Sequence, residues 1–107
     1  MVANQFAEAL AEGNFEGAHA LLSAGAKLMF PHSELQNQYR AMTGNDSGPA
    51  THVQVMQDLT SWPDKQRDDV GWVYVAIARD TSSEAVTVVV SRERGQDVIR
   101  SVEWGRP

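Results

Sequence analysis

Residues 71–92 of the chain read GWVYVAIARDTSSEAVTVVVSR. Two runs rich in β-branched and aromatic residues, 71–79 and 84–92, flank a short polar connection, which is typical of an antiparallel β-hairpin. An even-numbered loop between the runs places their alternate aliphatic side chains on one face of a sheet. This aliphatic face, which we expect to pack against the rest of the chain, consists of Val73, Val75, Ile77, Val86, Val88 and Val90.

A further strand follows the hairpin at residues 96–104. Gly95 would stand third in a loop that begins at Glu93, and a glycine there is typical of a type I turn with a bulge. In this register four residues join the aliphatic face, namely Val98, Arg100, Val102 and Trp104. The opposite face is too apolar for full exposure and too mixed for a core, and such a surface favours a partner. It holds Trp72, Tyr74, Ala76, Ala78, Thr87, Val89, Ile99, Ser101 and Glu103.

Before residue 44 the apolar residues have the period of helices. Gly13 is a natural end for a first helix, and Asn14 can cap a second. Ser33 and Gln36 have the spacing of a capping box for a third. The predicted apolar stripes are Val2, Phe6, Ala9 and Leu10; Phe15, Ala18, His19 and Leu22; and Leu35, Tyr39 and Met42.

Helix breakers crowd residues 44–49, and a strand with period 2 is predicted around residues 53–59. The mixed-charge run 64–69 is expected to be either a solvated connection to the next strand or a recognition loop. We therefore predict one α+β domain over residues 1–107, in which N-terminal helices pack on an antiparallel sheet of about four strands.

Composition narrows the possible functions. Nine Lys and Arg residues against fourteen Asp and Glu residues give a formal net charge of −5, which argues against nucleic acid or membrane surfaces as partners. The chain has no cysteine, and no His residues stand at a metal-ligand spacing, so neither a metal nor another cofactor is predicted. The first residues lack a basic start followed by an apolar run, which predicts a cytoplasmic location.

The order of these elements resembles the NTF2-like superfamily of cystatin-like α+β folds, as does the pattern Phe6, Leu10, Gly13, Asn14, Phe15, Ala18, Leu21 and Leu22. The resemblance covers nearly the whole chain. It implies a curved sheet, a half-barrel that wraps a helix to form a conical pocket, and dimerisation through the outer side of that sheet. Ketosteroid isomerases and SnoaL-like cyclases of this superfamily use an Asp base inside the cone, often with a Tyr on the first helix. Here the first two helices offer Phe6 and Phe15, so no catalytic motif carries over.

Five residues are candidates for a ligand site in such a cone: Arg100, Gln57, Tyr39, His19 and Trp104. Arg100 would either meet a ligand carboxylate or extend from the sheet rim to water. Gln57 would either lie beside it as a polar anchor or occupy a strand bulge or edge. His19 lies on an apolar helix face, where it is either a general base or a hydrogen-bonded boundary residue. Alternation places Asp58 away from the core.

Three functional hypotheses follow. The leading one is a noncatalytic module that binds a small apolar or anionic ligand or another protein, and that forms a homodimer through Trp72 and Tyr74, residue types favoured at interfaces. The alternative is a small isomerase or cyclase-like enzyme acting on an apolar substrate, with His19 or Asp58 as base and Gln57, Tyr39 and Arg100 for orientation. A third is an acidic inhibitor or immunity-type protein, which draws on the net charge alone.

Overall fold

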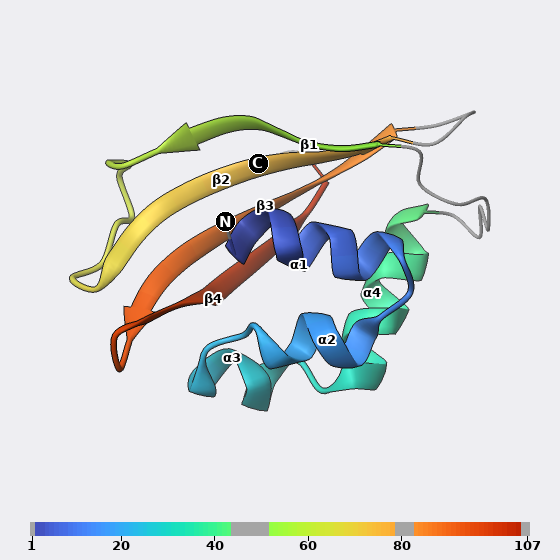
Figure 1. Cartoon of the computed structure of the whole chain (residues 1–107), viewed down its shortest axis with the longest axis horizontal. Coiled ribbons are helices and arrows are strands. Elements are labelled where there is room, and N and C mark those ends of the chain that lie inside the picture. The colour runs from blue at the N-terminus through green and yellow to red at the C-terminus, as the bar shows by residue number, and fades with distance from the viewer. Residues whose placement is uncertain (1, 44–51, 79–82, 106–107) are drawn as a thin grey trace.

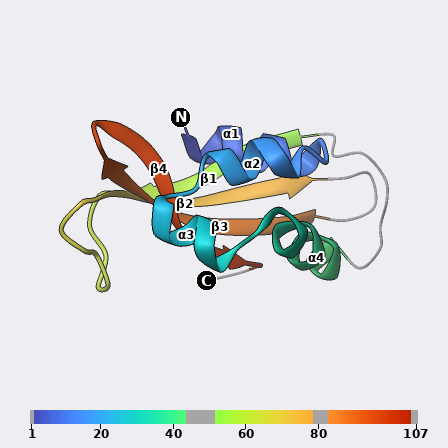
Figure 2. The same cartoon turned by 90° about the horizontal axis from the view of Figure 1, so that it is seen from below.

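The computed structural model describes residues 2–43, 52–78 and 83–105. Within these residues the chain forms four helices followed by four strands: α1 (Val2–Ala11), α2 (Phe15–Ala20), α3 (Ala24–Met29), α4 (His32–Thr43), β1 (His52–Leu59), β2 (Asp69–Ala78), β3 (Ser83–Glu93) and β4 (Gln96–Trp104). The helices lie together on one side of a bent sheet (Figure 1 and Figure 2). This is the predicted α+β arrangement. None of these helices is long and apolar enough to cross a membrane.

The sheet is antiparallel throughout, with the strand order β1-β2-β3-β4. In the central hairpin Val73 pairs with Val88 and Val75 with Val86, so the predicted aliphatic face is confirmed. The residues of its predicted loop, 80–83, lie outside the described part except for Ser83, which pairs with Ala78. We call this side of the sheet the inner face, because the helices pack on it.

The turn between β3 and β4 differs from the prediction. Arg94 and Gly95 both have positive φ, 53° and 77°, and Glu93 pairs with Gln96. Two positive φ values in a two-residue loop are the signature of a type I′ turn, so the predicted three-residue loop is wrong. The shorter loop shifts the first half of β4 by one position. Ile99 therefore pairs with Val90 and is fully buried in the core, whereas Val98 pairs with Ser91.

A β-bulge then reverses this shift. Val90 pairs with Ile99 but Val89 pairs with Ser101, which leaves Arg100 as the extra residue of β4. Beyond the bulge Val102 pairs with Val88 and Trp104 with Val86, so both lie on the inner face as predicted. The predicted faces of Val98, Ile99 and Arg100 are wrong because the turn and the bulge each move the register by one residue.

The helices begin near the predicted capping residues. The Asn14 side chain accepts a hydrogen bond from the Gly17 N–H at 2.9 Å, and Ser23 caps a short helix, α3, that the sequence analysis did not separate. Helix α4 starts at His32, one residue before the predicted cap. The core between helices and sheet contains the fully buried side chains of Phe6, Leu10, Leu35, Val75, Ile77, Val86, Val88 and Ile99.

Candidate functional site

Two large aromatic side chains lie on the side of the sheet that faces away from the helices. Trp72 and Tyr74 are half-buried there, with ring centroids 6.5 Å apart and ring planes inclined by 23°. Trp72 pairs with Val89 and Tyr74 with Thr87, and both β3 residues are buried although no described helix covers this side (Figure 1). We call this surface the outer face. It consists of Trp72, Tyr74, Ala76, Thr87, Val89, Ser101 and Glu103, of which Glu103, opposite Thr87 on β4, is charged.

A bulge at Met56 determines where the candidates in β1 lie. Because the pairing shifts between Val55 and Gln57, Gln57 stands opposite Tyr74 and not opposite an inner-face residue. Of the two alternatives for Gln57, the structure therefore has the strand bulge and edge and not the polar anchor beside Arg100; its side chain is exposed at the edge of the outer face. The same shift places Asp58 opposite Val73, an inner-face residue, but Asp58 is exposed where the strand leaves the helices.

Arg100 is held by a carboxylate of its own chain. Its Nε and Nη2 groups donate to the two carboxylate oxygens of Asp69, each at 2.7 Å, and the Gln66 backbone N–H donates to the same carboxylate at 2.8 Å. The Asp69 side chain is fully buried and that of Arg100 is 29% exposed. Bulges at Val70 and at Arg100 bring the two residues together across β3, on the side of Ser91.

The ionisation of both groups follows from this contact. Burial alone would raise the pKa of Asp69, but the hydrogen bonds from Arg100 and Gln66 and the charge of Arg100 together hold it below its usual value. The hydrogen bonds to Asp69 raise the pKa of Arg100 despite its partial burial. The pair is therefore fully ionised at neutral pH.

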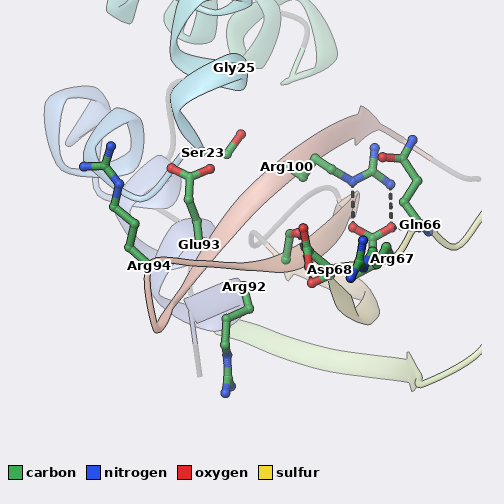
Figure 3. Close-up of a pocket in the computed structure, with 11 residues that line it drawn as sticks. Ser23, Gly25, Gln66, Arg67, Asp68, Arg92, Glu93, Arg94 and Arg100 are labelled. Carbon is green, nitrogen blue, oxygen red and sulfur yellow. Dashed lines mark hydrogen bonds and ion pairs between the residues drawn. The ribbon is translucent and has the colours of Figure 1, made fainter.

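The ion pair forms part of the wall of a polar hollow of about 660 Å³ at the end of the sheet where β2 begins and the β3–β4 hairpin turns (Figure 3). Four segments that are distant in the sequence contribute to it: residues 23–25, 66–69 and 91–94, and Arg100. The dashed lines in Figure 3 mark the two bonds from Arg100 to Asp69. We refer to this space as the hollow.

The other predicted ligand residues lie on the helix side of the sheet. Tyr39 is buried in the core, with its ring 5.8 Å from that of Phe15 and 6.3 Å from that of Trp104. The Trp104 indole N–H donates a hydrogen bond to the side-chain oxygen of Gln38. Tyr39 and Trp104 are thus brought together, but neither Gln57 nor Arg100 joins them.

His19 contacts another histidine. Its ring meets that of His32 edge to face, with centroids 4.3 Å apart, where α2 ends and α4 begins. The residues that the enzyme hypothesis requires are therefore dispersed over a helix junction, the core, the outer face and the hollow. No group of three or more His, Asp or Glu side chains within residues 2–43, 52–78 and 83–105 has a geometry that could hold a metal ion.

The part played by Asp69 was not predicted from the sequence, where Asp69 ends the mixed-charge run 64–69. Asp69 and Arg100 are 31 residues apart, and two bulges direct them toward each other. No glycine marks the bulge at Arg100, but in β2 Gly71 follows the extra residue Val70, and an isolated glycine within a strand is a bulge signal. This glycine and the position of Asp69 at the start of an apolar strand are the features that could have marked Asp69.

Comparison with known proteins bears on the fold. No protein-family model matches the chain, and no curated protein matches it by sequence. Among solved structures it is similar to a crystal structure from Campylobacter jejuni whose name places that protein among the NTF2-like transpeptidases. The TM-score is 0.68 and the identity 10%, over 92% of this chain and 94% of that chain. At this identity the likeness shows the fold alone, and the chain has the NTF2-like α+β fold that its sequence pattern predicted.

Proposed function

We propose that the protein is a noncatalytic interaction module that pairs with a second copy of itself through the outer face. The observation that supports this proposal is the Trp72–Tyr74 stack on a sheet side that no described helix covers. Tryptophan and tyrosine provide large, rigid contact areas and are the residue types that most often dominate interface energetics. Homodimerisation through the sheet is also what the NTF2-like resemblance implies.

The charge of the outer face favours a second copy over a basic partner. The chain has a net charge of −5, so two copies repel each other at long range. A surface evolved for a basic partner would carry acidic side chains at its centre. The centre of the outer face, on β2 and β3, instead contains Trp72, Tyr74, Thr87 and Val89, which are uncharged. The acidic residue Glu103 lies at its rim, on the edge strand β4. An uncharged centre lets two like-charged molecules come into contact without placing equal charges against each other.

Light scattering coupled to gel filtration, repeated over a range of protein concentrations, tests the proposal. The unmodified chain should have the mass of a dimer, and Trp72→Ala should weaken association by at least about 30-fold, because a central aromatic residue typically contributes 2 kcal/mol or more. Trp62→Ala is the matched control, since Trp62 lies in the β1–β2 connection outside the outer face. A strict monomer whose Trp72→Ala variant is equally soluble and stable would contradict the proposal.

A further inference from the structure

We propose that the hollow is a binding site for a small anion that carries carboxylate or phosphate groups, with Arg100 and Arg67 as its main contacts. This site is separate from the outer face, and the proposal does not depend on dimerisation. The lining includes four of the nine basic residues of an otherwise acidic chain: Arg67, Arg92, Arg94 and Arg100.

The orientation of Arg100 is fixed before any ligand arrives. Asp69 accepts from Nε and Nη2, and the buried carboxylate is itself held by the Gln66 N–H. The remaining group, Nη1, has no partner among the residues that the structure describes. Nη1 carries two N–H bonds, and because 29% of the Arg100 side chain is exposed, it can present both to the hollow. A guanidinium that is already immobilised loses little conformational entropy when it binds an anion.

The charges that line the hollow are nearly balanced, with four arginines against the carboxylates of Asp68, Asp69 and Glu93, in a chain whose net charge is −5. Glu93 accepts from the Ala24 N–H at 3.2 Å, and Arg92 is paired with Asp97 at 2.9 Å. Two arginines, Arg67 and Arg94, and two carboxylates, Asp68 and Glu93, have no ion-pair partner in the described ranges. The Nη1 group of Arg100 can only donate hydrogen bonds, so it favours an anion over a cation, and an anion completes the hydrogen bonding of Arg100 with charge-assisted bonds.

The two ends of the hollow differ. Arg67 follows Gln66, whose N–H binds Asp69, so Arg67 belongs to the same end as Arg100. Figure 3 shows Arg94 at the opposite side, with Glu93 between it and Arg100. A carboxylate of Glu93 disfavours an anion in the middle. The anion is therefore expected at the end formed by Arg100, Gln66 and Arg67, with Arg94 contributing only long-range attraction. Asp68 lies at this end as well, so the anion should contact Arg100 and Arg67 on the side away from that carboxylate.

Isothermal titration calorimetry with citrate and with inorganic phosphate, in low-salt buffer, tests this site. We expect saturable binding of at least one probe, weakened about tenfold by Arg67→Gln, since a charge-assisted hydrogen bond contributes roughly 1.5 kcal/mol. Arg94→Gln should weaken binding less. Arg40→Gln on α4, outside the hollow, is the matched control and should leave binding unchanged. The stronger of the two probes identifies the preferred anionic group.

Two results would overturn the proposal. One is the absence of saturable binding of both citrate and phosphate; the other is equal weakening by Arg67→Gln and Arg40→Gln, which would indicate nonspecific charge screening. The same titrations on Trp72→Ala separate this proposal from the previous one. Loss of dimerisation with retained anion binding would leave the hollow as a site in its own right.

Discussion

Asp69 and Arg100 show how a single contact can hold distant parts of the chain together. Asp69 is the first residue of β2, and its carboxylate also binds the N–H of Gln66 in the preceding connection. Arg100 lies in β4, two strands away. The contact between them thus ties the β1–β2 connection and β4 across β3. Breaking one partner of a buried ion pair is costly, because the other charge remains buried and unpaired.

Arg100→Gln should therefore destabilise the fold. We expect a loss of about 2–3 kcal/mol in the free energy of unfolding, since the partial exposure of Arg100 screens part of the effect expected for a fully buried pair. Urea denaturation followed by circular dichroism measures it. Arg92→Gln is the matched control: its pair with Asp97 is 59% and 44% exposed, so its removal should cost less than about 0.5 kcal/mol. Equal effects of the two substitutions would contradict the structural role of the Asp69 contact.

The same contact predicts a dependence of stability on pH. Folding lowers the pKa of Asp69, so its ionised form contributes stability that is complete well above the usual aspartate value of 3.8. This contribution is lost as the pH falls from that value toward the lower pKa of the folded state. The difference in unfolding free energy between the unmodified chain and Asp69→Asn should therefore shrink below pH 3.8. Urea titrations at pH values from neutral to acidic measure it, and parallel curves would count against a lowered pKa.

The sequence left Arg100 either against a ligand carboxylate or extended from the sheet rim to water, and it did not identify the carboxylate of Asp69 as its partner. Alternation along β4 placed Arg100 with Val98 and Val102, and only the bulge shows that it leaves this row. By contrast, the sequence alone was sufficient to place Trp72 and Tyr74 on the outer face, because the pairing of their strand with β3 is regular from residue 71 onward. Prediction from a pattern succeeds where the pattern is unbroken and fails at an inserted residue.

The β3–β4 hairpin illustrates the same limit for an element. Gly95 was correctly recognised as a turn residue, yet the turn has two residues and not three, because Arg94 also adopts positive φ. A side chain such as that of arginine rarely takes this conformation, so no simple rule predicts it. The bulge at Arg100 then restores the register, which explains why Val102 and Trp104 were placed correctly through a wrong loop.

Arg94→Asn should stabilise this hairpin. Asn-Gly is the preferred sequence of a type I′ turn, and asparagine tolerates the left-handed conformation better than arginine, so we expect a gain of roughly 0.5 kcal/mol. Gly95→Ala should have the opposite effect and cost about 1 kcal/mol, because φ at this position is positive. A Cβ at Gly95 would meet no atom within 4 Å, so this cost reflects backbone conformation and not a clash. Thermal unfolding without added anions measures both, and destabilisation by Arg94→Asn would argue against a type I′ turn.

Across the whole molecule, the helices and the sheet depend on one shared core. Helix α1 lies across the inner face (Figure 1 and Figure 2), and its Phe6 is fully buried with aliphatic residues of the strands in one hydrophobic cluster. Within the described residues, the helices bury these apolar side chains against the sheet, and the sheet buries its inner face against the helices. We therefore expect the helical first half and the sheet-forming second half to unfold together, as predicted for a single domain.

Phe6→Ala tests this cooperativity, because its two consequences can be followed separately. The three tryptophans, Trp62, Trp72 and Trp104, all belong to the second half, so fluorescence reports on the sheet, whereas the helical circular dichroism signal arises from the first half. Loss of a buried phenylalanine typically costs about 3–5 kcal/mol, and both signals should shift to the same lower urea concentration. Leu28→Ala is the control, since Leu28 is 86% exposed and its loss should move neither signal measurably. If the helical signal of Phe6→Ala disappeared while the fluorescence transition stayed in place, the sheet would be stable without the helices, and the chain would consist of two folding units.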